Sequence, residues 1–450
     1  MTGSLFGSIF TTDAVAAATS DEAFVEAMLE VEAALVRVGA DLGLVAAEAA
    51  EAVAACCDDA SRFDAGELGK AGRLGGNPVI PLVAALRQAV GGTAASAVHL
   101  GATSQDVLDS ATMLVAKRAS ACGLEALGEA AGAAAVLAEA HRDSLQLART
   151  LLQPALPTTF GLRAAGWLEA LAGSAARLEA VATALPLQFG GAAGTLASLG
   201  ANGLQFRRRL AAALGLEEPV LSWHTDRRVV AELAGALASA AGSCGKIARD
   251  VSLLMQAEIG EVAEPASPGR GASSTLPQKR NPVVSTAILA NSRRTGFLAG
   301  TLLSVMDQEL DRSPGGWQAE WEPLVALLRA AGGAAGLTAE LVSGLEVDPD
   351  RMVENLSSTG GSELAERARS ELAALVGPEE AAGLVDAAAR GAAEGSTTFA
   401  SALAAAIAEL GSSAASRLDL DVLFDPAGYL GSAGALVDLA LERYRQGARP

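Results

Sequence analysis

Apolar residues recur in this chain at alternating spacings of four and three residues, which is the spacing of a helix with one apolar face. Because each stripe is narrow, we expect such helices to pack nearly parallel, with small residues where they touch. Two such stripes are clear. The first consists of Ala164, Leu168, Leu171, Ala175, Leu178, Ala182 and Leu185, and the second of Leu233, Leu237, Ala240, Cys244, Ile247, Val251 and Leu254. Because Cys244 lies within the second stripe, we interpret it as a core residue.

Helical patterns also fill most of the remaining chain. Residues 21–56 are predicted to be helical, the second striped helix is expected to run to about Glu261, and another helix begins after Pro282. From about Asp348 the apolar spacing shortens, which indicates a smaller helical domain at the end of the chain. Alternating runs of β-branched residues are few. The sequence therefore predicts an all-α fold.

Composition and charge restrict the class of protein. Half of the 450 residues are hydrophobic but only 4% are aromatic, which suits closely packed helices. A formal net charge of -19 argues against a nucleic-acid partner, because phosphate neutralisation needs a basic surface. The first residues lack a signal-peptide pattern and no apolar run is long enough to span a membrane, so we expect neither. The four cysteines lack metal-ligand spacing, which indicates reduced thiols in a cytoplasmic protein.

Three polar islands, at residues 99–106, 148–161 and 271–282, interrupt the apolar background. The third reads Gly-Ala-Ser-Ser-Thr-Leu-Pro-Gln-Lys-Arg-Asn-Pro, a mixture that favours a loop over a helix or strand. Such a loop supplies backbone donors, hydroxyls, a cation and an amide, which can bind carboxylates and help to move a proton. An ordinary solvated loop is the alternative. The Gly-rich segment 188–194 lacks the spacing of a dinucleotide-binding loop.

Together the islands resemble the three signature regions of the fumarase/aspartase superfamily, over most of the chain. The third fits the family motif G-S-S-x-M-P-x-K-x-N-P, with Ala272 and Leu276 in place of the glycine and the methionine. The resemblance implies a small N-terminal helical domain, a long central five-helix bundle and a small C-terminal helical domain. We expect these at residues 1–110, 111–350 and 351–450. It also implies a homotetramer with a twenty-helix core and active sites shared between chains, without a metal or an organic cofactor.

The resemblance also assigns roles to individual residues. Members of this superfamily add or remove a group beside a carboxylate, through a carbanion that is stabilised as an aci-carboxylate. By motif position Ser273 matches the catalytic serine that handles the Cα proton, and Lys279 matches a residue that stabilises negative charge. Substrate-binding roles fall to Thr103, Ser104, Gln153, Ser274 and Asn281, of which Thr103 and Ser104 match the family's carboxylate-binding pair.

The second island departs from the family pattern at Leu151. Many relatives have a histidine after the Arg-Thr pair, and this histidine assists the departure of an amine or a hydroxyl. Leucine cannot donate a proton, so the substitution favours a reacting group that is stable as an anion, such as a carboxylate. Segments 76–83, 188–197, 223–225 and 317–321 resemble the cycloisomerase branch of the superfamily. This branch closes a lactone within a small tricarboxylate substrate.

Other readings of these residues stay open. A fumarate-releasing lyase similar to adenylosuccinate lyase is the main alternative, although it normally carries the missing histidine. An inactive structural member and a serine hydrolase are weaker alternatives, and no G-x-S-x-G elbow accompanies the histidines. His224 and Arg312 are candidates to contact a substrate carboxylate, against a structural role and a surface ion pair, respectively. Gln105 and Asp106 are expected to orient the Thr-Ser turn.

Overall fold

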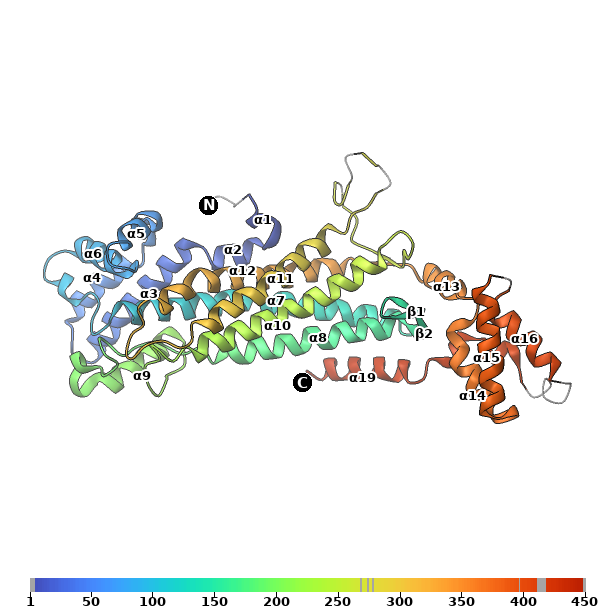
Figure 1. The fold of residues 1–450 in the computed structure, drawn as a ribbon. Coiled ribbons are helices and arrows are strands. Elements are labelled where there is room, and N and C mark those ends of the chain that lie inside the picture. The colour runs from blue at the N-terminus through green and yellow to red at the C-terminus, as the bar shows by residue number, and fades with distance from the viewer. Residues whose placement is uncertain are drawn as a thin grey trace. The chain divides into compact units, whose positions relative to one another are not determined.

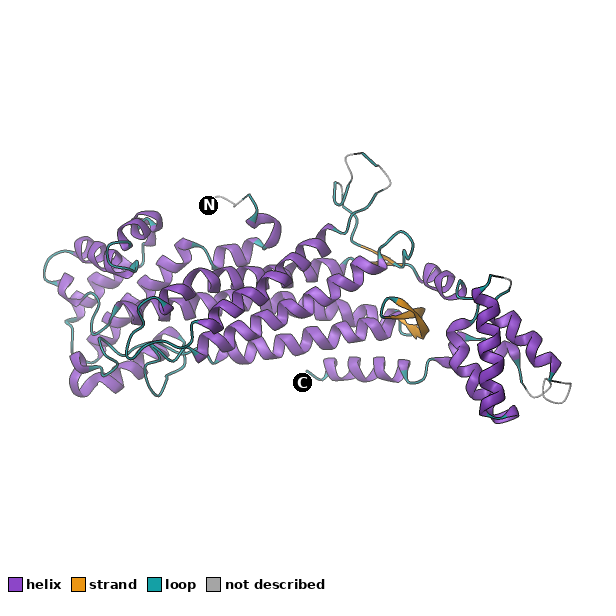
Figure 2. Ribbon diagram, in the orientation of Figure 1, coloured by secondary structure: helices purple, strands orange, loops and turns teal. Residues whose placement is uncertain are grey.

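The computed structural model describes residues 5–447, apart from 268, 273, 274, 277, 278, 396 and 411–417. Helices dominate this part of the chain, and the strands are short (Figure 2). The chain divides into two compact units, of which unit one comprises Met1–Glu129, Gly173–Ala248 and Val284–Ala339 and unit two comprises the remaining residues. The boundaries of the three expected domains stay a prediction. Five helices carry residues of both units: α7 (Ser104–Ala140), α8 (Phe160–Thr183), α10 (Arg228–Leu254), α11 (Val283–Ser304) and α12 (Gly316–Ser343).

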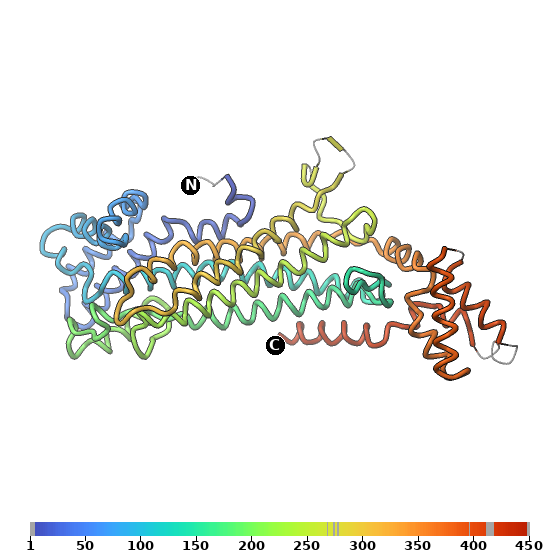
Figure 3. Tube along the Cα trace, in the orientation of Figure 1, coloured from blue at the N-terminus to red at the C-terminus, as the bar shows by residue number. Residues whose placement is uncertain are grey.

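The long helices of unit one run alongside each other (Figure 3). Small residues lie where these helices approach each other. A Cβ atom added to Gly123 of α7 would lie 3.9 Å from the Cα atom of Gly332 in α12. The hydroxyl oxygens of Ser174 in α8 and Ser243 in α10 are 2.9 Å apart. Cys244 is fully buried, and burial raises the pKa of its thiol to about 11. The seam of small residues and the core position of Cys244 are therefore as predicted.

The two apolar stripes are buried as expected, with one exception and one shifted boundary. Every residue of the second stripe is at most 4% exposed, and in the first stripe only Ala175 is partly exposed. The second helix ends at Leu254, so the prediction that it runs to about Glu261 was wrong. Gly260 has a positive φ of 64°, which a helix does not allow, and the Glu261 N–H instead donates to the Leu254 carbonyl at 2.9 Å.

The stretch 21–56, predicted to be helical, consists of two helices in the structure, α3 (Asp21–Asp41) and α4 (Ala47–Cys57). Gly43, with a φ of 71°, lies in the turn between them. The other short elements of unit one are α1 (Gly7–Phe10), α2 (Asp13–Ala18), η1 (Ala60–Arg62), α5 (Ala65–Gly72), α6 (Val79–Val90), η2 (Ala94–Ala97), η3 (Ala197–Asn202) and α9 (Gly203–Leu214) (Figure 1).

Unit two contains the strands and the C-terminal helices. Helices α14, α15 and α16 pack around an apolar cluster of their own, in which Leu372, Phe399 and Leu403 are at most 1% exposed. The strands are β1 (Leu145–Thr150), β2 (Gln153–Thr159), β3 (Val262–Ala263) and β4 (Glu346–Val347). The helices are α13 (Pro349–Ser357), η4 (Ser362–Leu364), α14 (Ala365–Val376), α15 (Pro378–Ala393), α16 (Phe399–Glu409), α18 (Leu420–Leu423), η5 (Pro426–Tyr429) and α19 (Ala433–Arg445).

Candidate active site

The first island ends where α7 begins. The Thr103 N–H donates to the carboxylate of Asp106 at 3.0 Å, as in a capping box, so Asp106 orients the Thr-Ser turn. Thr103 and Ser104 are both partly exposed at this turn. Their hydroxyls and the free N–H groups of the first helical turn make a site that favours an anion, because the positive end of the helix dipole lies there.

Asp106 joins three separate segments of unit one. Besides Thr103, its carboxylate accepts hydrogen bonds from the N–H groups of Gly190 at 3.0 Å and Gly191 at 2.8 Å. It also lies 2.8 Å from Nε2 of His224. Asp106 and His224 are 1% and 4% exposed, so this contact is buried. The geometry favours a positioning role for His224, which holds the Gly-rich segment and the start of α7 together.

Arg312 lies beside the first turn of α7. Its Nη1 donates to Oε1 of Gln105 at 3.2 Å, and its Nη2 donates to the Ala192 carbonyl at 2.9 Å. Glu309, the nearest carboxylate before it in the sequence apart from Asp311, accepts a hydrogen bond from Ser313 at 2.7 Å. Among the described residues, no carboxylate pairs with Arg312. Its positive charge is therefore available to an anion at the first island.

A buried charge cluster that the sequence analysis missed lies one turn further along α7. The guanidinium of Arg227 contacts Asp109 at 2.8 Å and Glu320 at 2.6 Å, and Trp317 Nε1 donates to Asp109 at 2.9 Å. All four residues are at most 4% exposed. Burial raises the pKa of the Glu320 carboxyl, Asp109 adds to this effect and Arg227 opposes it. The signal in the sequence was a set of charged residues in apolar surroundings, including Glu320 between two tryptophans.

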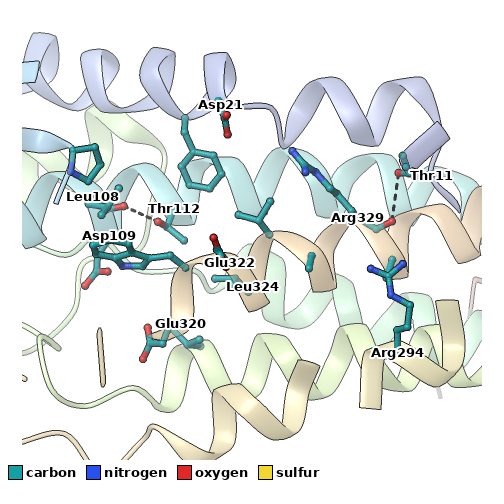
Figure 4. A pocket seen from close by; sticks show the side chains of 18 of the residues that line it. Thr11, Asp21, Leu108, Asp109, Thr112, Arg294, Glu320, Glu322, Leu324 and Arg329 are labelled. Carbon is teal, nitrogen blue, oxygen red and sulfur yellow. Dashed lines mark hydrogen bonds between the residues drawn. The ribbon is translucent and has the colours of Figure 1, made fainter. Parts of the chain in front are cut away.

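A cavity of about 710 Å³ lies on the other side of this cluster, between α3, α7, α11 and α12. Its lining is mainly apolar. Figure 4 shows Asp109 and Glu320 near one end of it and Arg294 and Arg329 near the other. None of the described residues with a predicted site role lines this cavity, so it is separate from the candidate active site.

The second island is a β-hairpin within an otherwise mostly helical fold, and the sequence analysis did not predict it. Thr150 pairs with Gln153, and Leu151 and Leu152 form the turn with positive φ angles of 52° and 65°. Both leucines are exposed, by 97% and 70%. Such a turn normally selects asparagine or glycine, and Pro154 interrupts the alternation in the second strand, so no strand pattern was visible.

A buried carboxylate anchors the stem of this hairpin. Glu261 is fully buried and accepts hydrogen bonds from Gln146 at 2.7 Å, from Arg149 at 2.7 and 3.2 Å, and from Asn355 at 2.8 Å. Arg149 therefore holds the hairpin in place, while Gln153 is exposed beside the turn. Glu261 also directly precedes β3, through which the chain leads to the third island.

The third island is a loop that is closed at its neck. Ala272 forms an antiparallel bridge with Arg280, and both the N–H and the side-chain amide of Asn281 donate to the Gly271 carbonyl, at 3.0 and 2.9 Å. Lys279 is exposed within the loop. Ser273 and Ser274 lie outside the described residues. Asn281 therefore closes the loop through its backbone N–H and its amide nitrogen, while its predicted contact with substrate stays a prediction.

Replacing Gly271 with alanine should lower activity by at least about tenfold, because both the backbone conformation and the space require glycine. Its φ is 64°, and an added Cβ would lie 2.6 Å from the Asn281 carbonyl oxygen. Gly269→Ala is the matched control, since Gly269 has a φ of 80° but an added Cβ would meet nothing within 4 Å. Steady-state kinetics of both variants separate the two effects. Equal losses would show that the close approach at Gly271 is unimportant.

The predicted site residues thus fall into two groups. Thr103, Ser104 and Arg312 belong to unit one and lie around the start of α7, with His224 buried behind them. The other described residues, Gln153, Lys279 and Asn281, belong to unit two, in the hairpin and in the closed loop.

Comparison with known proteins gives consistent results over nearly the whole chain. A model of the lyase family matches residues 8–295. The chain is 44% identical to a nitrosuccinate lyase of Streptomyces davaonensis, covering 95% of this chain and 92% of the relative. It is also 44% identical to a 3-carboxy-cis,cis-muconate cycloisomerase of Pseudomonas aeruginosa, covering 99% and 98%. The crystal structure of the 3-carboxy-cis,cis-muconate lactonizing enzyme from Pseudomonas putida superposes with a TM-score of 0.91 at 38% identity, covering 99% of this chain and all of that one.

The similarity of fold also explains why two of the long helices, α7 and α12, are apolar. By length and composition alone, α7 and α12 could each cross a membrane. Both are instead bundle helices of a fold that is shared with soluble lyases.

Proposed function

This chain belongs to the fumarase/aspartase family of lyases, and on that premise we propose that it is a cycloisomerase that converts 3-carboxy-cis,cis-muconate to a carboxymuconolactone. This reaction belongs to the breakdown of protocatechuate. The substrate is a small tricarboxylate, and its recognition requires cations and N–H donors rather than a metal. Arg312, the first turn of α7 and Lys279 supply such groups.

The proposed reaction forms one C–O bond and one C–H bond. A carboxylate oxygen of the substrate bonds to one carbon of a double bond, and the π electrons move to the neighbouring carbon. The carboxylate attached to that carbon stabilises the charge as an aci-carboxylate, and Lys279 and the loop donors lower its energy. Ser273 then delivers the proton. A serine hydroxyl is a weak acid, so its neighbours in the loop are expected to stabilise the alkoxide that remains.

The observation that supports this proposal best is Leu151 at the exposed tip of the hairpin. A leucine side chain can neither donate nor accept a proton, so the group that adds or leaves near it has to be stable as an anion. An ionised carboxylate meets this requirement in both directions of the reaction. Amines and hydroxyls, which depart poorly without a proton, do not.

A second candidate is elimination of nitrite from nitrosuccinate, and the relative from Streptomyces davaonensis is the reason to consider it. Loss of a proton from the methylene carbon, and of the nitro group from the neighbouring carbon as nitrite, would leave the double bond of fumarate. Because nitrite is also a stable anion, the argument from Leu151 does not separate the two reactions. Substrate charge does separate them, since nitrosuccinate has two carboxylates and 3-carboxymuconate has three.

Assays of the purified protein with both substrates distinguish these proposals. We expect 3-carboxymuconate to lose its diene absorbance at a rate proportional to enzyme concentration, and nitrosuccinate to release little nitrite in a colorimetric test. Nitrite release with unchanged diene absorbance would replace the first proposal by the second. Release of fumarate from adenylosuccinate would indicate the remaining lyase alternative.

We further propose that the protein works as a homotetramer with active sites shared between chains. The family relationship supports this proposal. Light scattering on a sizing column measures the mass of the particle directly, and a monomer that is active at nanomolar concentration would contradict it.

A further inference from the structure

We propose that Gln105 is a positioning residue that sets the orientation of Arg312, so that this arginine and the first turn of α7 together form one subsite for a substrate carboxylate. The inference rests on the proposed function, because it assigns a place for one carboxylate of its substrate. It adds a residue that itself makes no contact with the reacting atoms.

The amide of Gln105 has a single orientation in this environment. The side chain is fully buried, and its Nε2 donates to Asp109 at 3.1 Å and to the His224 carbonyl at 2.9 Å. Both partners act as acceptors at these positions, because the His224 carbonyl has no hydrogen to donate and the Asp109 oxygens also accept from Arg227 and Trp317. The amide oxygen must therefore point the opposite way, toward Arg312.

This orientation presents an acceptor to Arg312 without neutralising its charge. Gln105 Oε1 and the Ala192 carbonyl bind the two terminal nitrogens of the guanidinium at 3.2 and 2.9 Å. Both acceptors are uncharged, and a guanidinium has five N–H donors, so most remain available. A carboxylate in place of either acceptor would pair with Arg312 and compete with the substrate.

The same side chain also places Arg312 beside the anion-binding end of α7. Gln105 is the second residue of this helix, directly after Ser104. The guanidinium is therefore bound to a side chain of the first turn of α7, the turn that also carries the N–H groups and hydroxyls of the helix start. A planar guanidinium and a helix N-terminus are both suited to one carboxylate.

A double-mutant cycle tests the inference, with Gln105→Met, Arg312→Ala and the double variant. The probe is propane-1,2,3-tricarboxylate, and its Kd is measured by titration calorimetry, which needs no turnover. Arg312→Ala should raise the Kd about tenfold to 100-fold, as expected for lost hydrogen bonds to a charged group. Gln105→Met alone should raise the Kd about threefold to tenfold. In the Arg312→Ala background, the same substitution should leave the Kd unchanged. Equal effects in both backgrounds would show a merely structural role and overturn the inference.

Two further measurements keep this result interpretable. Arg312→Lys retains the charge and leaves Gln105 intact, so the protein should fold normally. It should still raise the Kd, because an ammonium cannot make the contacts of the oriented guanidinium. This variant can be measured even if the Gln105→Met protein is unstable. If Arg312→Lys binds the probe as tightly as the wild type, or if the wild type does not bind it, the subsite is wrong. Turnover of 3-carboxymuconate is measured in parallel. Coupled binding without turnover would contradict the proposed function but not the subsite.

Discussion

Replacing Ser273 with alanine is expected to lower kcat by about 100-fold to 10,000-fold, the usual contribution of a group that transfers a proton in the transition state. The substitution removes one hydroxyl, so the fold and the oligomer should persist. Stopped-flow or steady-state measurement of diene loss gives kcat, and KM should change by less than kcat does.

The neighbouring serine provides the control for this result. Ser274→Ala removes a hydroxyl from the same loop, where the resemblance assigns only substrate binding. We expect it to act mainly on KM. A Ser273→Ala enzyme with nearly normal kcat, or a larger loss of kcat in Ser274→Ala, would remove Ser273 from its assigned role.

Replacing Arg227 with methionine should lower the free energy of unfolding by about 3–5 kcal/mol, because it leaves two buried carboxylates without their cation. Asp109 and Glu320 are 3% and 2% exposed, so water compensates only poorly for the lost guanidinium. Denaturant unfolding at a fixed protein concentration measures the loss. A change below about 1 kcal/mol, as is typical of a surface ion pair, would show that the cluster is hydrated in solution.

Glu320→Gln is the matched variant for the other side of this ion pair, and its effect should depend on pH. The pKa of Glu320 is raised above its ordinary value of 4.5, mainly by burial. In the window above 4.5 the folded protein retains a proton that the unfolded chain has released, so the wild type loses stability as pH rises. The variant lacks this titration. Unfolding at pH 5 and at pH 8 should therefore show the variant gaining on the wild type at the higher pH.

The helical framework followed from the sequence because its signals are local. The stripe from Leu233 to Leu254 repeats over seven positions, and every one of them is buried. The helix boundaries were harder to predict, since a single residue such as Gly43, directly after the end of α3, breaks a helix through its backbone conformation. The sequence alone does not distinguish a glycine within a helix from a glycine with a positive φ in a turn.

The hairpin and the charge cluster could not be predicted in this way. Leu151 and Leu152 adopt turn angles that leucine rarely takes, and the tertiary contacts of the stem with Glu261 compensate for their weak local preference. Asp109, Arg227 and Glu320 are far apart in the sequence, so only the fold brings their charges together. Family motifs found the candidate active-site residues, but they could not show that Gln105 orients Arg312.

The buried Glu261 has a consequence for how the specificity of such a protein evolves. It fixes the hairpin stem through Gln146 and Arg149 and, through Asn355, the helix α13. The two residues of the turn share none of these bonds. Mutations at Leu151 and Leu152 should therefore leave the bonds that hold the scaffold intact. If the tip faces the substrate as proposed, a change of substrate could arise at this turn with little loss of stability.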